Sequence, residues 1–573
     1  MATLKDLTTA FEEIAVLLDL MGENPFKGRA YANAARIVQS GELGLADLAA
    51  RSLAGEIKGI GKGLAEKIDE LQRTGEIAYL NELRAAFPAG LLEMLRIPGL
   101  GAKKIRTLHQ ELGIQSVGDL EEACRENHLL KVAGFGAKSQ ENILAGIERL
   151  RRFSGLFLYS TARRIADELL AHLRATGLAE RLAIGGSLRR RKEIVKDIDL
   201  LAASSQPARL MEAFVNTPGV AQITGHGETK SSVVLAGGIA VDLRVVDETQ
   251  YAAAWVHFTG SKEHNTQLRS LAKDQNRKLS EYGLFENDAP LPLRDETDLY
   301  RRLGLHFVPP ELREGLGEIE RAARGDFPAL VDDADVQGVL HAHTTYSDGQ
   351  LTLRQLALLV RDRGYHYLGV TDHSQSAAYA GGLKPDDLKR QHDEIDALNE
   401  ELAPFIIFKG IESDILADGR LDYDERELAA FDFVIASVHS RFNLGEEEMT
   451  RRIVAALENP YTTILGHPTG RLLLSRDGYA VNLPAVLDAA ARCGVAVEIN
   501  ANPHRLDLDW RHHRRARELG IPIPICPDAH TPAGLDDIAY GVGTARKGGL
   551  TKEDVPTCWP AARLAEYFTR RKQ

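Results

Sequence analysis

The chain has 573 residues, of which 44% are hydrophobic and 27% are charged, and its formal net charge is −12. This length exceeds what one hydrophobic core usually stabilises, so several domains are expected. The composition matches globular proteins and offers no apolar run long enough to span a bilayer, and the acidic total argues against a simple nucleic-acid coat protein.

Targeting signals and disulfides are not expected. The first residues, MATLKDLTTAFEEIAVLLDL, carry acidic side chains inside an apolar repeat, which predicts an amphipathic helix instead of a signal peptide and hence a cytosolic protein. The cysteines Cys124, Cys493, Cys526 and Cys558 lack any short paired spacing. Reduced, buried thiols are therefore expected in place of disulfides or a thiolate zinc site.

A glycine-containing turn occurs three times in the first 150 residues, in IKGIGKGLAEKI, LRIPGLGAKKIRTL and VAGFGAKSQENI. Each turn opens a predicted helix, and its exposed amides would suit a phosphate oxygen. The repeats resemble helix-hairpin-helix elements, which hold the DNA backbone without reading its sequence. Plain turns between helices are the alternative, but three of them followed by lysine favour DNA binding. The expected backbone contacts lie at Gly59, Gly61, Gly99, Gly101, Gly134 and Gly136.

Three aspartates mark a first chemical site. Asp197 and Asp199 lie two residues apart in an apolar strand, so both carboxylates point to one face, and the apolar run GGIAVDLRVVDE adds Asp242. Carboxylates on adjacent strands are the ligands that a pair of Mg²⁺ or Mn²⁺ ions requires. The turn at residues 185–187 and the arginines after it could hold a triphosphate. A common turn and a surface acid pair are the alternative, which the third strand-borne aspartate disfavours.

A second site is predicted from residue 336 onward, where apolar strand candidates alternate with helical segments, as in a βα barrel. The carboxyl ends of barrel strands meet at one face, where catalytic groups gather. Imidazole mixed with carboxylate suits two or three Mn²⁺ or Zn²⁺ ions, or Fe²⁺. The strand-end residues are His341, His343, His373, Glu412, His439, His467, Glu498, Asn500, Asp528 and His530.

The motifs up to about residue 315, including HFTGSKEHN at 257–265, resemble the family X DNA polymerases, the DNA polymerase beta-like nucleotidyltransferases. The resemblance implies gapped or nicked DNA and dNTPs as substrates. Asp242 would help to deprotonate the primer 3′ hydroxyl, and Glu281 and Tyr282 would assist domain closure. The implied contacts are Asp197, Asp199 and Asp242 to metal, Gly186, Ser187 and Arg190 to phosphates, Phe258 and Gly260 to the sugar, Asn265 to the base and Arg269 to the template strand.

Two further positions follow from this resemblance. His257 stands where the best-known eukaryotic members carry tyrosine, so a nucleotide contact and a packed histidine without a role are both open. The N-terminal segment resembles the family's small lyase domain, in which Lys67 aligns with the Schiff-base lysine and Tyr31 and Lys27 with 5′-phosphate contacts. A lysine that contacts the DNA backbone is the alternative for Lys67.

The C-terminal set, with Asp348 from the loop TTYSDG, resembles the polymerase and histidinol phosphatase (PHP) family, and Glu498 falls outside that family's ligands. The resemblance implies hydrolysis of a phosphodiester or phosphomonoester. The implied metal ligands are His341, His343, Asp348, His373, Glu412, His439, His467, Asp528 and His530.

We therefore expect a multidomain chain with helical helix-hairpin-helix domains, an α+β nucleotidyltransferase palm and thumb, and a C-terminal distorted (β/α)7 barrel. The predicted domains are an 8-kDa-like domain at 1–85, a fingers-like domain at 86–152, a palm at 153–246, a thumb-like domain at 247–316, a linker at 317–335 and a PHP domain at 336–573.

The order of these parts resembles the bacterial and archaeal branch of family X, which joins gap filling to a 3′ to 5′ exonuclease and, in some members, an abasic-site endonuclease or a 3′-phosphatase. A monomer without membrane contact is expected. Three alternatives remain: a PHP phosphoesterase fused to a DNA-tethering module with little polymerase activity, a small-molecule phosphatase of the histidinol phosphate type, and a DNA-binding scaffold.

Overall fold

The computed structural model describes residues 3–40, 43–85 and 89–572. The chain divides into two compact units, Met1–Ser154 and Gly155–Gln573. The predicted boundary after residue 85 adjoins residues 86–88, which lie outside the described residues, as do the first two residues of the predicted N-terminal helix. Among the described helices, none is both long and apolar enough to cross a membrane.

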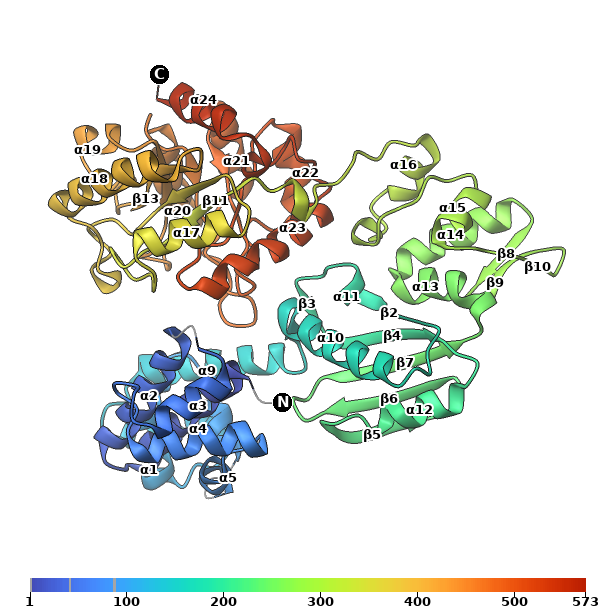
Figure 1. Ribbon diagram of the computed structural model, residues 1–573, viewed down its shortest axis with the longest axis horizontal. Coiled ribbons are helices and arrows are strands. Elements are labelled where there is room, and N and C mark those ends of the chain that lie inside the picture. Colours follow the sequence, from blue (N-terminus) through green and yellow to red (C-terminus); the bar gives the residue numbers. More distant parts are fainter. Residues whose placement is uncertain (1–2, 41–42, 86–88, 573) are drawn as a thin grey trace. The chain divides into compact units, whose positions relative to one another are not determined.

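The N-terminal unit is helical (Figure 1). Thr3 caps its first helix, because the side chain accepts a hydrogen bond from the Asp6 amide at 3.2 Å. Leu7, Phe11 and Ile14 repeat at helical spacing and are fully buried in a core shared with the later helices. The helices are α1 (Leu4–Met21), α2 (Pro25–Ser40), α3 (Leu45–Leu53), α4 (Lys62–Thr74), α5 (Ala78–Ala85), α6 (Ala89–Met94), α7 (Ala102–Leu112), α8 (Val117–Arg125) and α9 (Ala137–Phe153).

The second unit begins with a mixed sheet in the order β2-β4-β7-β6-β5, against which α10 (Tyr159–Ala175) and α12 (Pro207–Val215) pack (Figure 1). The strands are β2 (Arg181–Ile184), β4 (Asp197–Ala203), β5 (Val220–His226), β6 (Lys230–Leu235) and β7 (Ala240–Val246), and the short β1 (Phe157–Leu158) pairs with β3 (Ile194–Val195). β4 and β7 run parallel at its centre, in a register that pairs Asp199 with Asp242. This pairing places the predicted aspartates together.

A smaller helical layer follows, with its own core around Leu268, Leu299 and Tyr300. Its elements are α13 (Tyr251–Thr259), α14 (Lys262–Asp274), β8 (Arg277–Ser280), β9 (Gly283–Glu286), β10 (Ala289–Leu291) and α15 (Glu296–Arg302). The stretch predicted as a linker contains α16 (Glu318–Arg324), whose Ile319 packs into that core. Helical structure therefore continues into the predicted linker.

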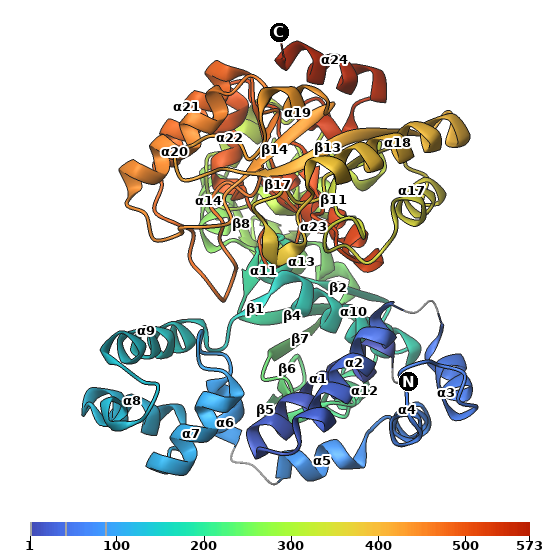
Figure 2. The ribbon, with the colours of Figure 1, turned by 90° about the vertical axis from the view of Figure 1, so that its left-hand side faces the viewer.

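The C-terminal part is a barrel of parallel strands with helices around it (Figure 2). Its strands are β11 (Gly338–Ala342), β12 (Tyr367–Val370), β13 (Ile406–Asp414), β14 (Phe433–Ser437), β15 (Ile464–Leu465), β16 (Ala496–Val497), β17 (Ile499–Asn500) and β18 (Ile525–Cys526). β11 to β16 pair in chain order, β17 pairs with β18, and a bridge between Ala342 and Ala529 returns to the first strand. The barrel is distorted because the strand at Glu498 is broken in two.

Helices cover the outside of these strands, so the strands are buried on both faces and read as continuous apolar runs. The helices are α17 (Leu353–Asp362), α18 (Pro385–Leu402), α19 (Glu425–Ala429), α20 (Glu446–Glu458), α21 (Leu483–Cys493), α22 (Trp510–Glu518), α23 (Ile538–Lys547) and α24 (Ala561–Arg571). This arrangement fits the predicted barrel class.

Candidate active sites

Asp197, Asp199 and Asp242 lie on the two central strands of the mixed sheet, with Asp199 directly opposite Asp242. Burial, together with the negative charges of Asp197 and Asp242, raises the pKa of Asp199 to about 6. Lys230, on β6, places its Nζ 2.5 Å from Asp242 Oδ2. Crowded carboxylates that repel one another need a cation, so this donor set fits divalent metal ions.

The Gly185-Gly186 turn is shaped by its contact with these strands. Gly186 has a φ of +57°, and a Cβ there would lie 2.0 Å from Asp199 Oδ2. A Cβ at Gly185 would lie 3.2 Å from the Phe258 carbonyl oxygen. The contact and the φ at Gly186 require glycine, and the space at Gly185 is tight for any side chain. The turn opens the short helix α11 (Gly186–Arg189), on which Ser187 is half-buried.

The residues predicted to contact the nucleotide lie together at the junction of the sheet and the helical layer. Arg190 Nη1 donates to the Thr259 carbonyl at 2.5 Å, next to Gly260. Asn265 Nδ2 donates to the His257 carbonyl at 2.7 Å. These contacts join the segment that follows the glycine turn to the segment HFTGSKEHN.

His257 is fixed by several neighbours. Its Nδ1 lies 3.0 Å from Arg269 Nη2 and 3.8 Å from Glu281 Oε2, and its ring packs edge-on against Phe258. Burial lowers the pKa of His257, which Glu281 partly offsets. Tyr282, predicted beside Glu281, is 60% exposed. The structure therefore brings His257 and Arg269 into contact, although sequence reasoning treated them separately.

The three repeated glycine turns adopt one conformation. Gly59, Gly99 and Gly134 have φ values of +92°, +80° and +88°. Gly61, Gly101 and Gly136 then cap α4, α7 and α9, and no side chain caps any of these three described helix starts. A Cβ at Gly61, Gly101 or Gly136 would meet nothing within 4 Å. The amides of the first turns are thus open to an anion.

Lys67, Lys27 and Tyr31 gather around one aromatic ring. Lys67 Nζ lies 4.9 Å and Lys27 Nζ 5.3 Å from the centroid of Tyr79, on which Tyr31 stacks at 6.3 Å. A hydrogen bond to Tyr79 raises the pKa of Lys27. Sequence reasoning missed Tyr79, which carries no motif of its own.

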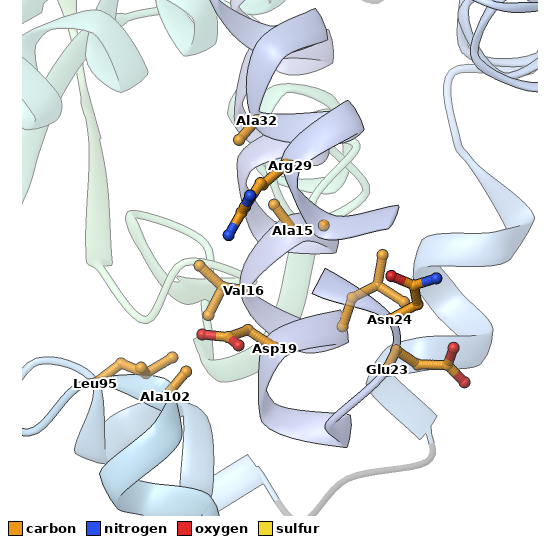
Figure 3. A pocket seen from close by; sticks show the side chains of 11 residues that line it. Ala15, Val16, Asp19, Glu23, Asn24, Arg29, Ala32, Leu95 and Ala102 are labelled. Carbon is orange, nitrogen blue, oxygen red and sulfur yellow. The ribbon is translucent and has the colours of Figure 1, made fainter. Parts of the chain in front are cut away.

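A separate hollow of about 530 Å³ in the same unit is lined by Asp19, Glu23, Arg29 and apolar side chains (Figure 3). The lysines around Tyr79 do not line it. Figure 3 shows Asp19 near the end of α1 and Glu23 on the turn between α1 and α2. The hollow therefore does not belong to the cluster around Tyr79.

The predicted C-terminal ligands converge at the carboxyl ends of the barrel strands around Glu412, which is buried on β13. Its Oε1 lies 3.4 Å from His341 Nε2, 3.2 Å from His439 Nε2 and 3.0 Å from His467 Nε2. Three groups have ligand atoms close enough to share an ion: His343, Asp348, His373 and His530; His341, His343 and Asp528; and His373, Glu412 and His439. All nine predicted ligands therefore lie within one cluster.

The cluster carries the signs of a metal centre. Although they are buried, His341 Nε2, His343 Nδ1 and Glu412 Oε2 have no hydrogen-bond partner among the residues that the structure describes. Burial and the neighbouring His530 lower the pKa of His343 to about 4, which favours the neutral imidazole that ligates metal. Burial acts to raise the pKa of Glu412, but His439 and His341 hold this pKa well below its usual range. Although burial acts in the opposite direction, the surrounding carboxylates raise the pKa of His439 to about 10 and that of His530 to about 9, so a cation is attracted to this site either as a proton or as a metal ion. The mixture of nitrogen and oxygen donors fits divalent ions.

Three ligand positions adopt the left-handed backbone conformation: His341 with a φ of +63°, His467 with +21° and Asp528 with +52°. Residues other than glycine adopt this conformation at an energetic cost, and the surrounding structure must impose it. Such backbone strain at strand ends is typical of residues in active or binding sites.

A second layer of side chains orients the ligands. Glu498 Oε1 lies 2.7 Å from His341 Nδ1, and Glu498 Oε2 accepts the His467 amide at 2.6 Å. Asp414 Oδ1 lies 2.6 Å from His439 Nδ1. Such carboxylate–histidine pairs fix the ring and direct its other nitrogen toward a metal. Sequence reasoning left Glu498 without a role and missed Asp414, although Asp414 follows Glu412 by two residues on one strand.

Comparisons with known proteins cover 96% of the chain. Family models of a helix-hairpin-helix domain, a SAM-like helix-hairpin-helix tandem and the DNA polymerase beta thumb match residues 3–77, 91–149 and 254–314. The DNA polymerase/3′-5′ exonuclease PolX of Bacillus subtilis (strain 168) is 39% identical over 96% of this chain and 96% of its own.

The chain belongs to the bacterial family X DNA polymerases with a C-terminal PHP domain. Its C-terminal part is also similar to shorter proteins of this PHP type. A probable phosphatase of Thermoanaerobacter sp. (strain X514) is 28% identical over 41% of this chain and 96% of its own, and one of Syntrophotalea carbinolica is 30% identical over 38% and 89%. The family assignment rests on the relative that matches along the whole length.

Proposed function

We propose that this protein extends DNA primers across short gaps at the aspartate centre and removes 3′-terminal nucleotides at the barrel centre. The observation that carries the proposal is the 39% identity to a DNA polymerase/3′-5′ exonuclease along 96% of both chains. Two complete clusters of acidic and imidazole side chains support it. The substrates are gapped or nicked DNA and dNTPs.

At the aspartate centre, Asp197 and Asp199 would hold two Mg²⁺ or Mn²⁺ ions, with Asp242 as the third carboxylate. When bound, such ions neutralise the charge that develops on the transferred phosphate. Asp242 accepts the proton of the primer 3′ hydroxyl. Gly186, Ser187 and Arg190 bind the triphosphate of the incoming nucleotide through an amide, a hydroxyl and a guanidinium group.

The segment after β7 selects the nucleotide. Phe258 and Gly260 border the sugar, Asn265 faces the base, and Arg269 lies along the template strand. His257 holds Arg269 through the contact of 3.0 Å between Nδ1 and Nη2. The helix-hairpin-helix glycines Gly59, Gly61, Gly99, Gly101, Gly134 and Gly136 bind the DNA backbone.

At the barrel centre the nine clustered side chains hold two or three Mn²⁺, Zn²⁺ or Fe²⁺ ions: His341, His343, Asp348, His373, Glu412, His439, His467, Asp528 and His530. When bound, these ions activate water and stabilise charge on the phosphate. Glu498 and Asp414 hold the imidazoles in place. The reaction is hydrolysis of a phosphate ester at a DNA 3′ end.

The proposal also includes the assembly state, the location, the domain bounds and a lyase site. The protein acts as a monomer in the cytoplasm, with the domain bounds predicted at residues 85, 152, 246, 316 and 335. Lys67 forms a Schiff base with an abasic sugar, and Lys27 and Tyr31 bind the 5′ phosphate beside it. The closeness of Lys67 and Lys27 to one ring supports this role.

The polymerase assignment is tested with Asp199→Asn on a duplex with a one-nucleotide gap. Incorporation should be lost while binding to the gapped duplex is kept, because the variant removes a metal ligand and leaves the glycine turns intact. Incorporation by Asp199→Asn at the wild-type rate would refute the site. Failure of the wild-type protein to fill gaps would favour a PHP phosphoesterase tethered to DNA.

The barrel assignment is tested with His343→Ala, metal analysis and three substrates: a 3′-hydroxyl, a 3′-phosphorylated and an abasic duplex. Bound metal and 3′ excision should be lost together. Excision that persists without metal contradicts the assignment. Similarity of the C-terminal part to probable phosphatases favours a 3′-phosphatase as a second activity, which the phosphorylated duplex reports directly.

A further inference from the structure

Lys547, the last residue of α23 in the C-terminal barrel, has a side chain with no solvent exposure. Its Nζ donates to the Arg190 carbonyl at 2.9 Å, to the Glu311 carbonyl at 3.3 Å and to Glu314 Oε1 at 2.5 Å. It also lies 4.6 Å from the centroid of the Trp510 ring. A buried ammonium group with three oxygen partners is held in one position.

Glu314 has three cationic partners. Lys547 Nζ is the nearest, Arg190 Nε donates to Glu314 at 3.1 Å, and Lys192 Nζ lies 3.8 Å from its Oε2. The Glu314 side chain is 10% exposed, whereas that of Lys192 is 34% exposed. Arg190 is the guanidinium assigned above to the incoming triphosphate. A buried carboxylate next to that guanidinium competes with the triphosphate for it, because both are anions. Lys547 neutralises this carboxylate and lies outside the polymerase part of the chain.

We propose that Lys547 is a positioning residue for DNA synthesis: by pairing with Glu314, it keeps the Arg190 guanidinium available for the incoming nucleotide. The inference rests on the proposed role of Arg190. It assigns to the barrel a part in nucleotide binding that is separate from hydrolysis.

Other contacts attach Arg191 and Glu193 to the barrel. The effect of Lys547 on Arg190 can therefore be separated from the attachment itself. Glu193 accepts from Arg511 Nη1 at 2.8 Å and from Trp510 Nε1 at 3.2 Å. Arg191 Nη1 donates to the Ala539 carbonyl at 3.4 Å, and α23 and α11 lie near one another in Figure 2. The segment therefore remains attached to α22 and α23 when Lys547 loses its charge.

The test is Lys547→Met, which keeps the length of the side chain and removes its charge. The KM for a dNTP in a one-nucleotide gap should rise about tenfold, as expected when a charge-assisted contact is weakened, while kcat stays within about twofold. Excision of 3′ nucleotides should be unchanged. An unchanged dNTP KM overturns the inference.

The matched control is Arg546→Met, because Arg546 binds Glu311 Oε1 at 2.7 Å at the same contact surface but touches neither Arg190 nor Glu314. Its dNTP KM should stay at the wild-type value. An equal rise in Arg546→Met and Lys547→Met would mean that attachment alone matters, which overturns the inference.

A second variant removes the competing charge. In Glu314→Gln the added change Lys547→Met should no longer raise the KM, because no carboxylate remains to be neutralised. A tenfold rise in that background overturns the inference, and this comparison holds even where Lys547→Met alone folds poorly. Failure of the wild-type protein to fill gaps is a separate outcome, which rejects the proposed function itself.

Discussion

Two carboxylates show how neighbours decide the state of a side chain. Asp199 is half-buried and Glu412 is fully buried, and in both the loss of water acts to raise the pKa. Carboxylates surround Asp199 and raise its pKa further, whereas imidazoles surround Glu412 and hold its pKa well below the usual range. The aspartate site thus binds protons or cations, which relieve the repulsion between its carboxylates. At the barrel site, the imidazoles already offset part of the negative charge of Glu412.

Gly186→Ala should abolish most DNA synthesis. The added Cβ would lie 2.0 Å from Asp199 Oδ2, and the φ of +57° is strained for alanine. We expect incorporation to fall at least about 100-fold, since small displacements of reacting groups are costly, with 3′ excision unchanged. The control is Gly238→Ala, at a φ of +83° in open space, where synthesis should persist. Equal losses in both variants would contradict the steric argument.

Glu296 predicts a dependence of stability on pH. Burial opposes its charge, but Arg313 and Arg189 lower the pKa of Glu296 to about 2. Because the folded pKa lies below the unfolded value near 4.5, this stabilisation is present above about pH 4.5 and disappears as the pH falls toward 2.

Glu296→Gln should therefore reduce the free energy of unfolding by about 3 kcal/mol at pH 7, because two buried guanidinium groups lose their partner. The difference from wild type should shrink between pH 4.5 and 2. The centroid of the Trp255 ring lies 3.5 Å from Arg189 Cζ, so the fluorescence of Trp255 serves as the signal for unfolding. A difference that stays constant down to pH 2 would rule out the ion pair as its cause.

At the scale of elements, one short turn is used three times. The carbonyl oxygens of Ile57, Ile97 and Val132 each accept the amide three residues later, at 3.2, 3.1 and 3.1 Å. A helix start then follows two residues after the left-handed glycine in each copy. Repetition of an identical turn with open amides favours simultaneous contacts with successive phosphates of one backbone.

Gly99→Ala should weaken DNA binding without changing sequence preference. Alanine at a φ of +80° costs about 1 kcal/mol and distorts the amides that face the phosphate. Binding to duplexes of different sequence, measured over a range of salt, should weaken to the same extent. The control is Gly113→Ala, with a φ of +69° at the other end of α7. Equal weakening by both variants would show that helix stability alone is responsible.

At the scale of the whole molecule, the chain contains two separate clusters of candidate metal ligands. The aspartates lie on β4 and β7 of the mixed sheet, and the histidines lie on the strand ends of the barrel. No ligand is shared between them among the described residues. Variants of one centre should therefore leave the other intact.

Asp242→Asn should abolish primer extension and leave 3′ excision within about twofold of wild type, and His343→Ala should do the reverse, because distant sites act independently. The measurement is one gel assay with a labelled primer, in which dNTPs are supplied or withheld. Loss of both activities in either single variant would contradict separate centres. The folded state of each variant is compared by thermal unfolding.

Much of both candidate sites could be predicted from the sequence. Strand periodicity places Asp197 and Asp199 on one face of a strand, and the histidines at strand ends are expected at one end of the barrel. Glu498, Asp414 and Lys230 could not be assigned in this way. Each pairs with a residue of another segment, as Glu498 does with His341 and Lys230 with Asp242 on the adjacent strand, and no local pattern encodes such a pair.

The sequence by itself determined the family and predicted two clusters of candidate metal ligands and three glycine turns, because these depend on residue type and short-range spacing. The tertiary structure alone decided which side chains orient the ligands, how the Gly186 turn meets Asp199, and that Lys547 and Arg190 share Glu314. The physical reason is that pairing, burial and steric exclusion depend on distances between segments that are remote in the chain, and those distances are fixed only by packing.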